Sequence, residues 1–147
     1  MPSRRREVVA RSHSDKPVDA VWALVADAPT WKRWARFTVS EYEREGEPAP
    51  HGVGAIRRFG FPVYTSREEV VAFEPPTHLG YILRAGLPLR GYRSDVTLTP
   101  SGDVTEIEWR SSFDGRAADG WFWQGFLRLT IGDFARRLAR AAERQDA

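Results

Sequence analysis

Apolar and small residues recur at every second position between residues 90 and 113, and charged or polar residues occupy the positions between them. A period of two is that of a β-strand, whose successive side chains point to opposite faces. The pattern predicts strands over 90–99 and 104–113, each with one packed face and one solvated face. The predicted packed face holds Tyr92, Ser94, Val96, Leu98, Thr105, Ile107, Trp109, Ser111 and Phe113.

Turn residues divide the preceding part of the chain into further predicted strands. Breaks at Gly60-Phe-Pro62, Glu74-Pro-Pro76 and Gly86-Leu-Pro88 separate runs that are rich in strand-forming residues. These runs predict strands over 7–14, 38–44, 53–59, 63–73 and 77–85. The inward face of 63–73 stays open, because Val70 and Val71 would lie on opposite faces. Six successive strands with short connections predict an antiparallel meander.

Helical periodicity is found at the two ends of this strand region. Apolar residues at helical spacing predict a helix over 17–26, followed by a short helix over 30–35 that carries Trp31 and Trp34 on one side. The last apolar stripe predicts a helix from about 120 to 144, roughly 37 Å long. Gly125 and Gly132 fall within that helix. We expect them to allow close packing on the sheet, with space for a bound molecule beneath them as the alternative.

The order of elements predicts an α+β fold in a single domain over 7–144, with 1–6 and 145–147 as flexible termini. A seven-stranded antiparallel sheet of this kind must twist and curve, and the long last helix is the element available to cover its apolar face. A curved sheet and a single helix do not meet completely. We therefore expect a cavity between them.

Aromatic residues are abundant, with six Trp, eight Phe and four Tyr among 147 residues. Aromatic side chains supply much of the area in cores and in apolar pockets. In this architecture they become candidate ligand-binding residues of the cavity wall. The candidates are Trp22, Phe37, Phe59, Tyr81, Tyr92, Trp109, Phe113, Phe122, Phe126 and Phe134.

The composition excludes several kinds of site and partner. The absence of cysteine excludes a disulfide framework, a thiolate metal site and a cysteine nucleophile. Three scattered histidines predict no metal site. The net charge of +2 comes from 22 basic and 20 acidic residues, so we expect no nucleic-acid partner. No apolar run is long enough to span a membrane, and no signal peptide is evident, so we expect a cytoplasmic protein.

Several segments resemble the START-related, pollen-allergen-like superfamily known as SRPBCC. They include Pro17-Val-Asp-Ala-Val-Trp22, Val70-Val-Ala-Phe-Glu-Pro-Pro76 and Thr105-Glu-Ile-Glu-Trp109. Within the superfamily the chain most resembles the bacterial polyketide cyclase/dehydrase and lipid-transport-like group. The resemblance implies a helix-grip fold, in which a curved sheet wraps around a long C-terminal helix. It also implies a cavity for apolar molecules such as lipids or polyketides.

No nucleophile, metal or phosphate motif is present, and we expect no cofactor. A cofactor-free enzyme would need only an acid or base facing the cavity. Each candidate side chain could equally be solvated or ion-paired, so the catalytic residues remain unknown. The candidates are Arg57, Glu69, His78, Tyr81, Arg84 and Tyr92.

Trp31-Lys32-Arg33-Trp34 combines two tryptophans with two basic residues. We expect the tryptophans to cap the open end of the core. The alternative is a pocket rim that touches a membrane transiently during ligand transfer, since the segment is too short for stable anchoring.

The sequence thus favours a protein that binds a hydrophobic or amphipathic small molecule. A cofactor-free polyketide cyclase, dehydratase or aromatase is the first alternative. A protein whose cavity is filled by its own side chains is the second. The oligomeric state and the ligand stay open.

Overall fold

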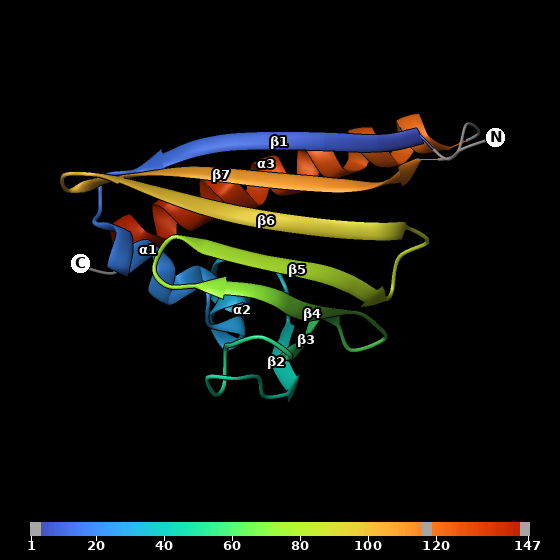
Figure 1. Ribbon diagram of the computed structural model, residues 1–147, viewed down its shortest axis with the longest axis horizontal. Coiled ribbons are helices and arrows are strands. Elements are labelled where there is room, and N and C mark those ends of the chain that lie inside the picture. The colour runs from blue at the N-terminus through green and yellow to red at the C-terminus, as the bar shows by residue number, and fades with distance from the viewer. Residues whose placement is uncertain (1–3, 116–118, 145–147) are drawn as a thin grey trace.

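The computed structural model describes residues 4–115 and 119–144, and their elements follow the predicted order (Figure 1). In chain order these are β1 (Arg4–Ser14), α1 (Val18–Val25), the short 3-10 turn η1 (Ala28–Thr30), α2 (Trp31–Trp34), β2 (Val39–Arg44), β3 (Ile56–Phe61), β4 (Tyr64–Glu74), β5 (His78–Ala85), β6 (Arg90–Ser101), β7 (Val104–Gly115) and α3 (Gly120–Arg144).

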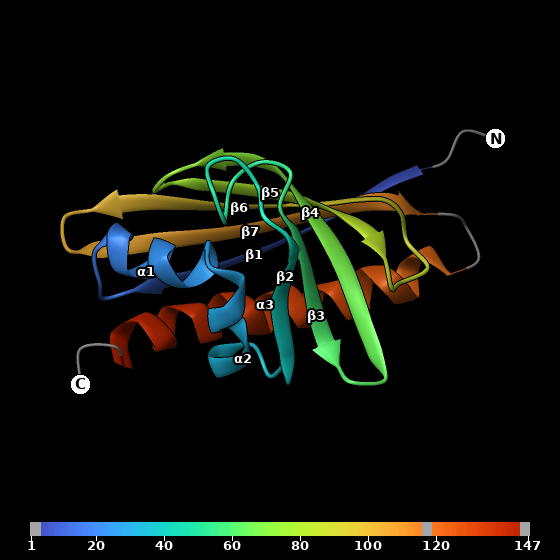
Figure 2. The same cartoon turned by 90° about the horizontal axis from the view of Figure 1, so that it is seen from below.

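The strands form one antiparallel sheet in the order β1-β7-β6-β5-β4-β3-β2. Each strand after β1 is thus a neighbour of the next in sequence, as expected for a meander, and β1 closes beside β7. Figure 2 shows the sheet curling from β1 round to β2, with α3 on its concave side. The predicted α+β helix-grip fold is confirmed.

The period-two pattern is confirmed on β6 and β7, where all the predicted inward residues are buried. On β5, Leu79 and Tyr81 are buried as well. Helix α3 covers this face with one stripe of small and aliphatic side chains. The stripe consists of Leu127, Ile131, Ala135, Leu138 and Ala142, each at most 2 % exposed. Apolar burial between the sheet and α3 therefore forms the main core.

Two predicted boundaries are wrong. β1 begins at Arg4, so Arg4–Arg6, expected in a flexible terminus, pair with residues 113–115 of β7. β3 begins at Ile56 rather than at residue 53, because residues 45–55 form a loop closed by an isolated bridge between Glu47 and Val53. Residues 1–3 and 145–147 lie outside the described residues.

β4 carries the irregularity that its sequence pattern could not settle. Its pairing with β5 shifts between Arg67 and Glu68 and again between Val70 and Ala72. A bulge places one extra residue on a strand and resets the alternation of faces. As a result Val70 is fully buried and Glu68 shares its inward side, while Glu69 pairs with the exposed Arg84.

Neither expectation for the two glycines of α3 is met. A Cβ atom built on Gly125 would meet no atom within 4 Å, and one on Gly132 would meet only the end of Arg136 at 3.5 Å. Close packing on the sheet therefore does not explain them. The residues that line the pocket described below do not include either glycine.

Leu138 on α3 provides a test of the core. Replacing this fully buried side chain by alanine should lower the free energy of unfolding by about 2–5 kcal/mol, because it removes buried methyl groups and leaves a cavity. Leu129→Ala, on the same helix but 77 % exposed, is the control and should change it by less than about 0.5 kcal/mol. Urea unfolding measures both, and equal losses would contradict the assigned packing of α3.

Candidate ligand-binding pocket

A pocket of about 540 Å³ lies between the first half of α3 and the curled part of the sheet. Its walls come from α3 between Phe126 and Phe134, from β3 to β6, and from the segment that follows α2. Most of the lining is apolar, and its inner wall includes the buried rings of Phe59, Tyr81 and Tyr92. The pocket therefore lies between the sheet and α3.

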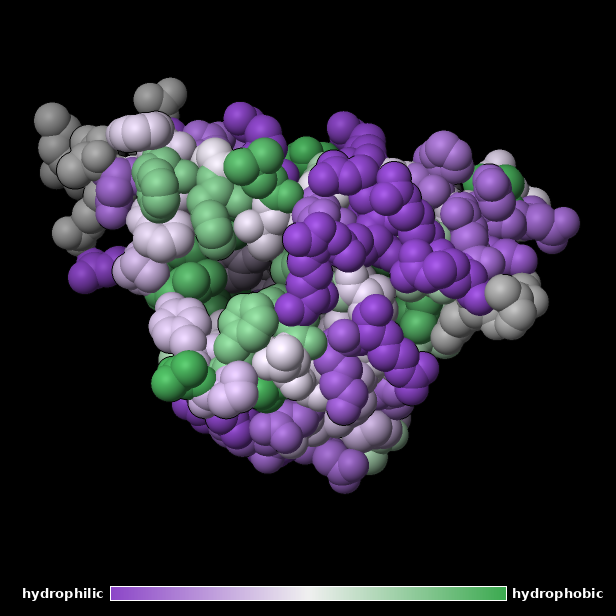
Figure 3. Space-filling model, turned by 180° about the vertical axis from the view of Figure 1, so that it is seen from behind, coloured by the Kyte–Doolittle hydropathy of each residue, from purple (hydrophilic) through white to green (hydrophobic). Residues whose placement is uncertain are grey.

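Exposed apolar side chains surround the mouth of this pocket. Phe61 and Tyr64 come from the β3–β4 hairpin, and Phe126 and Leu129 come from α3. Figure 3 shows a hollow on this face with apolar side chains gathered around it. Gly60 keeps the hairpin tight, since a Cβ there would lie 2.3 Å from the carbonyl oxygen of Tyr64. The mouth thus offers an apolar molecule a continuous route from solvent to the interior.

The other half of the space under the sheet is filled by an aromatic block. Trp31 is 1 % exposed, stacks on Phe59 with ring centroids 4.5 Å apart, and contacts Trp109 at 5.6 Å. Trp34 is 2 % exposed and packs against Trp31. The two tryptophans are therefore part of the core. The alternative of an exposed tryptophan rim at this segment is wrong.

Of the ten predicted ligand-binding residues, the structure brings six together in the pocket wall. These are Phe37, Phe59, Tyr81, Tyr92, Phe126 and Phe134. That any of them contacts a ligand stays a prediction.

The remaining four lie elsewhere. Trp22 packs against Phe73 with ring centroids 5.4 Å apart, away from the pocket. Trp109 is behind the wall, where its indole N–H donates to the Tyr81 hydroxyl at 3.2 Å. Phe113 is buried outside the lining, and Phe122 is half exposed on α3.

An ion pair is built into the inner side of the sheet. Arg57 on β3 and Glu68 on β4 are directly opposite each other in the antiparallel pair, and Arg57 Nη2 donates to Glu68 Oε1 at 3.2 Å. The Arg57 side chain is fully buried, whereas Glu68 lines the pocket and keeps 13 % of its side-chain area exposed. The pair therefore presents its carboxylate, rather than its guanidinium, to the cavity.

Aromatic rings surround the buried guanidinium. The Cζ atom of Arg57 lies 5.0 Å from the centroids of Trp31 and Phe59 and 4.6 Å from that of Tyr81. Such contacts stabilise a desolvated cation. The Nε and Nη1 atoms nevertheless have no hydrogen-bond partner in the described structure. Glu68 is thus the counter-ion on which this buried charge depends.

The burial of Glu68 changes its acidity. Desolvation raises the pKa of its carboxyl to about 7, although the charge and the hydrogen bond of Arg57 act in the opposite direction. Burial also raises the pKa of Tyr92 to about 12 and that of Tyr81 well above its ordinary value. Near neutral pH the carboxyl of Glu68 can therefore gain or lose a proton while both phenols stay protonated.

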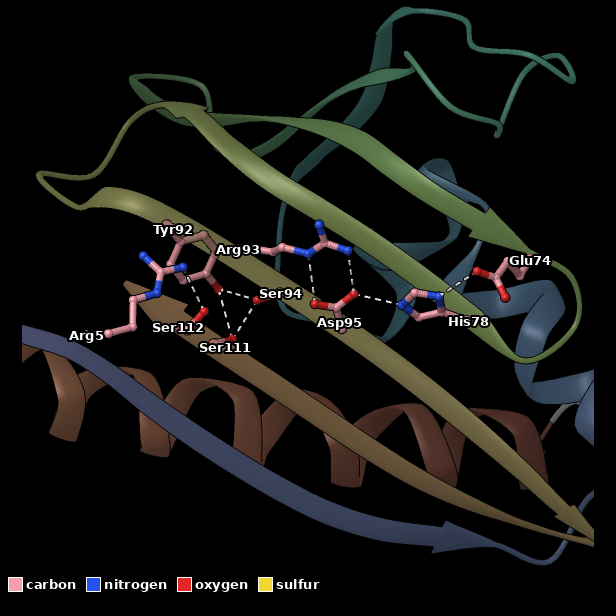
Figure 4. A network of polar contacts seen from close by, with 9 residues as sticks. All are labelled: Arg5, Glu74, His78, Tyr92, Arg93, Ser94, Asp95, Ser111 and Ser112. Atoms are coloured by element: carbon pink, nitrogen blue, oxygen red, sulfur yellow. Dashed lines mark hydrogen bonds and ion pairs between the residues drawn. The ribbon is translucent and has the colours of Figure 1, made fainter. Parts of the chain in front are cut away.

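Hydroxyl groups complete the polar part of the inner face (Figure 4). Ser94 donates to the Tyr92 hydroxyl at 2.7 Å, Tyr92 lies 3.3 Å from Ser111 Oγ, and the two serine hydroxyls contact each other. Three hydroxyls can each donate to the next around such a ring. The ring fixes the phenol of Tyr92 in the pocket wall and leaves little of its hydrogen-bonding capacity unused.

Most of the acid–base candidates chosen from the sequence do not face the pocket. His78 lies on the outer side of the sheet, between Asp95 at 2.7 Å and Glu74 at 3.3 Å (Figure 4). Glu69 and Arg84 form an ion pair with each other. Tyr81 and Tyr92 do line the pocket, and Arg57 lies behind it.

On the sheet side, the carboxyl that lines the pocket belongs to Glu68, which the sequence analysis missed in favour of Glu69. Asp133 lines the pocket from α3. The signal that could have found Glu68 is its spacing of two from Val70, combined with the choice of Val70 as the inward residue. The bulge in β4 hid that choice.

The fold and this pocket define a helix-grip protein. A sequence model described as "Polyketide cyclase / dehydrase and lipid transport" matches residues 5–144. Because the match covers nearly the whole chain, the protein belongs to that family, and the resemblance to the SRPBCC superfamily is confirmed. No curated protein matches the chain.

Solved structures agree with the fold. A protein from Thermobifida fusca is 24 % identical, with coverage of 94 % of this chain and 91 % of that one and a TM-score of 0.75. Norcoclaurine synthase from Thalictrum flavum, solved with dopamine and hydroxybenzaldehyde, is 13 % identical, with coverage of 97 % and 88 % and a TM-score of 0.71. DynU16, from the dynemicin biosynthetic locus, is 26 % identical with a TM-score of 0.72, and the match spans 93 % of this chain but 47 % of DynU16.

Among residues 4–115 and 119–144, no helix is both long and apolar enough to cross a bilayer. Within the same residues no group of three or more histidine, aspartate or glutamate side chains is arranged to hold a metal ion.

Replacing Arg57 by methionine tests the buried pair. The variant leaves the Glu68 carboxylate without its counter-ion, so the free energy of unfolding should fall by about 3–5 kcal/mol at about pH 8. The folded-state pKa of Glu68 is already above its ordinary value, and it should rise further. A carboxyl whose pKa is raised by folding contributes stability below its unfolded pKa, and this contribution is lost as pH rises through the folded pKa. The destabilisation caused by Arg57→Met should therefore be smaller at about pH 5 than at about pH 8.

Arg58→Met is the matched control, because Arg58 is the next residue and forms a more exposed pair with Glu41. Its effect should stay within about 1 kcal/mol at either pH. Denaturant unfolding at the two pH values measures both variants. An equal loss for Arg57→Met at both values would show that the charge of Glu68 is not the cause.

Proposed function

We propose that this protein binds a hydrophobic or amphipathic small molecule in the pocket between the sheet and α3. The observation that carries the proposal is the pocket itself, which is apolar, about 540 Å³ in volume and open between α3 and the β3–β4 hairpin. Ligand sites in proteins occupy about 300–1,000 Å³ and combine apolar walls with a few polar groups. Burial of an apolar guest would be favourable by roughly 25 cal/mol for each Å² removed from water.

The comparisons support the same class of ligand. The family description names polyketides and lipids, which are largely apolar molecules. Norcoclaurine synthase, with the same fold, is solved with two small aromatic molecules. These relatives support the kind of guest.

Blocking the pocket tests this proposal. Thr130 lines the pocket from α3, so Thr130→Trp should place an indole in the cavity and weaken the binding of apolar ligands at least about tenfold. Arg136→Trp adds the same ring to an exposed position of the same helix that does not line the pocket, and it should leave binding unchanged.

Binding can be followed by calorimetry and by thermal shift with fatty acids, flavonoids and aromatic polyketides. Wild-type protein should be stabilised by at least one of these classes, and Thr130→Trp should not respond. Either no response of the wild type to any of them, or equal binding by Thr130→Trp, would refute ligand binding in this pocket.

A second candidate function is cofactor-free acid–base catalysis, such as cyclisation or dehydration of a polyketide. The observation that favours it is the carboxyl of Glu68, which lies in a mostly apolar wall and whose pKa is raised by burial to about 7. A group that titrates near the working pH is suited to donate and accept protons.

If the protein is such an enzyme, Glu68→Gln should lower the rate of product formation from a linear poly-β-ketone by about 10²–10⁴-fold. Glu69→Gln, on the neighbouring residue outside the pocket, should retain the wild-type rate. Mass spectrometry of the products provides the measurement. Product formation at the wild-type rate by Glu68→Gln would exclude Glu68 as the catalytic group.

A further inference from the structure

The carboxyl of Glu68 has one oxygen engaged and one available. Oε1 accepts the hydrogen bond from Arg57, and among the described contacts no partner is found for Oε2. The side chain lines the pocket and retains 13 % of its exposure. A molecule that fills the pocket would therefore meet Oε2 of a carboxyl group that Arg57 already holds in place through Oε1.

Arg57 itself is out of reach of such a molecule. Its side chain is fully buried behind the wall, among Trp31, Phe59 and Tyr81. The guanidinium therefore orients the carboxylate and compensates its charge, but it does not offer the pocket a donor. The polar contact available at this wall is consequently with a hydrogen-bond acceptor.

Several other polar groups near the pocket are engaged within the protein. The Tyr92 hydroxyl belongs to the ring with Ser94 and Ser111, and the Tyr81 hydroxyl accepts from Trp109. On α3, Asp133 accepts from Arg137 at 2.8 Å and lies 4.0 Å from Arg36. On the sheet side of the pocket, Oε2 of Glu68 is thus a carboxyl oxygen that a guest can satisfy.

We propose that the pocket selects amphipathic molecules that carry a hydroxyl group, phenolic or alcoholic, at their inner end, and that the Glu68 carboxylate accepts the hydrogen bond from that hydroxyl. This inference rests on the proposed ligand-binding function and specifies the chemistry of its ligand. A hydroxyl can donate to the free oxygen without adding charge to the buried pair. A ligand carboxylate would instead place a second negative charge beside Glu68.

The strength of the hydrogen bond from the ligand hydroxyl to Glu68 depends on pH. An ionised carboxylate is a stronger acceptor than a carboxylic acid, because its hydrogen bonds are charge-assisted. Burial raises the pKa of Glu68 to about 7, so its ionised fraction grows as pH rises through neutrality. The charged groups at this pocket include Arg57, Arg36 and Asp133. Tyr81 and Tyr92, whose pKa values are raised, stay neutral over this range. A hydroxyl ligand should therefore bind more tightly as pH rises through about 7.

Three ligands with one aromatic body separate the contributions. β-Naphthol carries the donor, its methyl ether lacks the donor, and β-naphthoate carries a negative charge. Calorimetric titration of wild-type protein at about pH 5.5 and about pH 8 should show naphthol binding about tenfold tighter at the higher pH, where the competent form dominates. The methyl ether should bind equally at both values, and naphthoate should bind more tightly at the lower one.

Two variants assign the effect to this residue. Glu68→Gln should remove the pH dependence of naphthol binding, and Glu69→Gln, on the outer side of the sheet, should preserve it. If Glu68→Gln does not fold because Arg57 loses its counter-ion, the double variant Arg57→Met/Glu68→Gln removes both charges and serves instead. The wild-type comparison of the three ligands requires no variant.

The outcomes distinguish this inference from the function on which it rests. If naphthol and its methyl ether bind equally and without pH dependence, the role of Glu68 is wrong and ligand binding by the pocket stands. If naphthoate shows the same increase with pH as naphthol, the role of Glu68 is also wrong. If none of the three binds at either pH, both the pocket function and the role of Glu68 are overturned.

Discussion

The structure depends on how one positive charge is accommodated under the sheet. Arg57 is fully buried, and a guanidinium stays ionised at every pH that a protein experiences. Burying such a charge without a partner would cost several kcal/mol, so the fold must provide a carboxylate and polarisable rings around it. β3 and β4 meet this need by placing Glu68 directly opposite Arg57, with Trp31, Phe59 and Tyr81 around the cation. An ionisable carboxyl in a mostly apolar wall follows from this arrangement.

The aromatic content of the chain divides between two tasks. Trp31, Trp34 and Trp109 fill the space beside the second half of α3. Phe134 belongs both to this block and to the pocket wall, so the filled and open regions share a boundary. Beyond it the curl of β3 and β4 carries the sheet away from the helix. The aromatic block and the pocket therefore occupy neighbouring parts of the space between the sheet and α3.

Much of the fold could be predicted from the sequence because its pattern is regular. The alternation along 90–113 and the apolar stripe of 126–142 each match a single kind of element, so both the strands and the long helix were predicted correctly. The inward face of β4 could not be predicted in the same way. Its bulge near Val71 breaks the period of two, and the sequence analysis therefore chose Glu69 as a candidate instead of the inward-facing Glu68. The predicted pocket wall was wrong for four aromatic residues, because composition shows that a residue is aromatic but not which side of the wall it occupies. These residues are Trp22, Trp109, Phe113 and Phe122.

The most direct test of this account is the titration of Glu68 itself, by carbon-13 NMR of the side-chain carboxyl in glutamate-labelled protein. The resonance is assigned by its absence in Glu68→Gln or in the double variant with Arg57→Met. The account predicts a midpoint near the pKa of about 7, which moves to lower pH when β-naphthol saturates the pocket. A midpoint near the ordinary glutamate value, unchanged by the ligand, would contradict it.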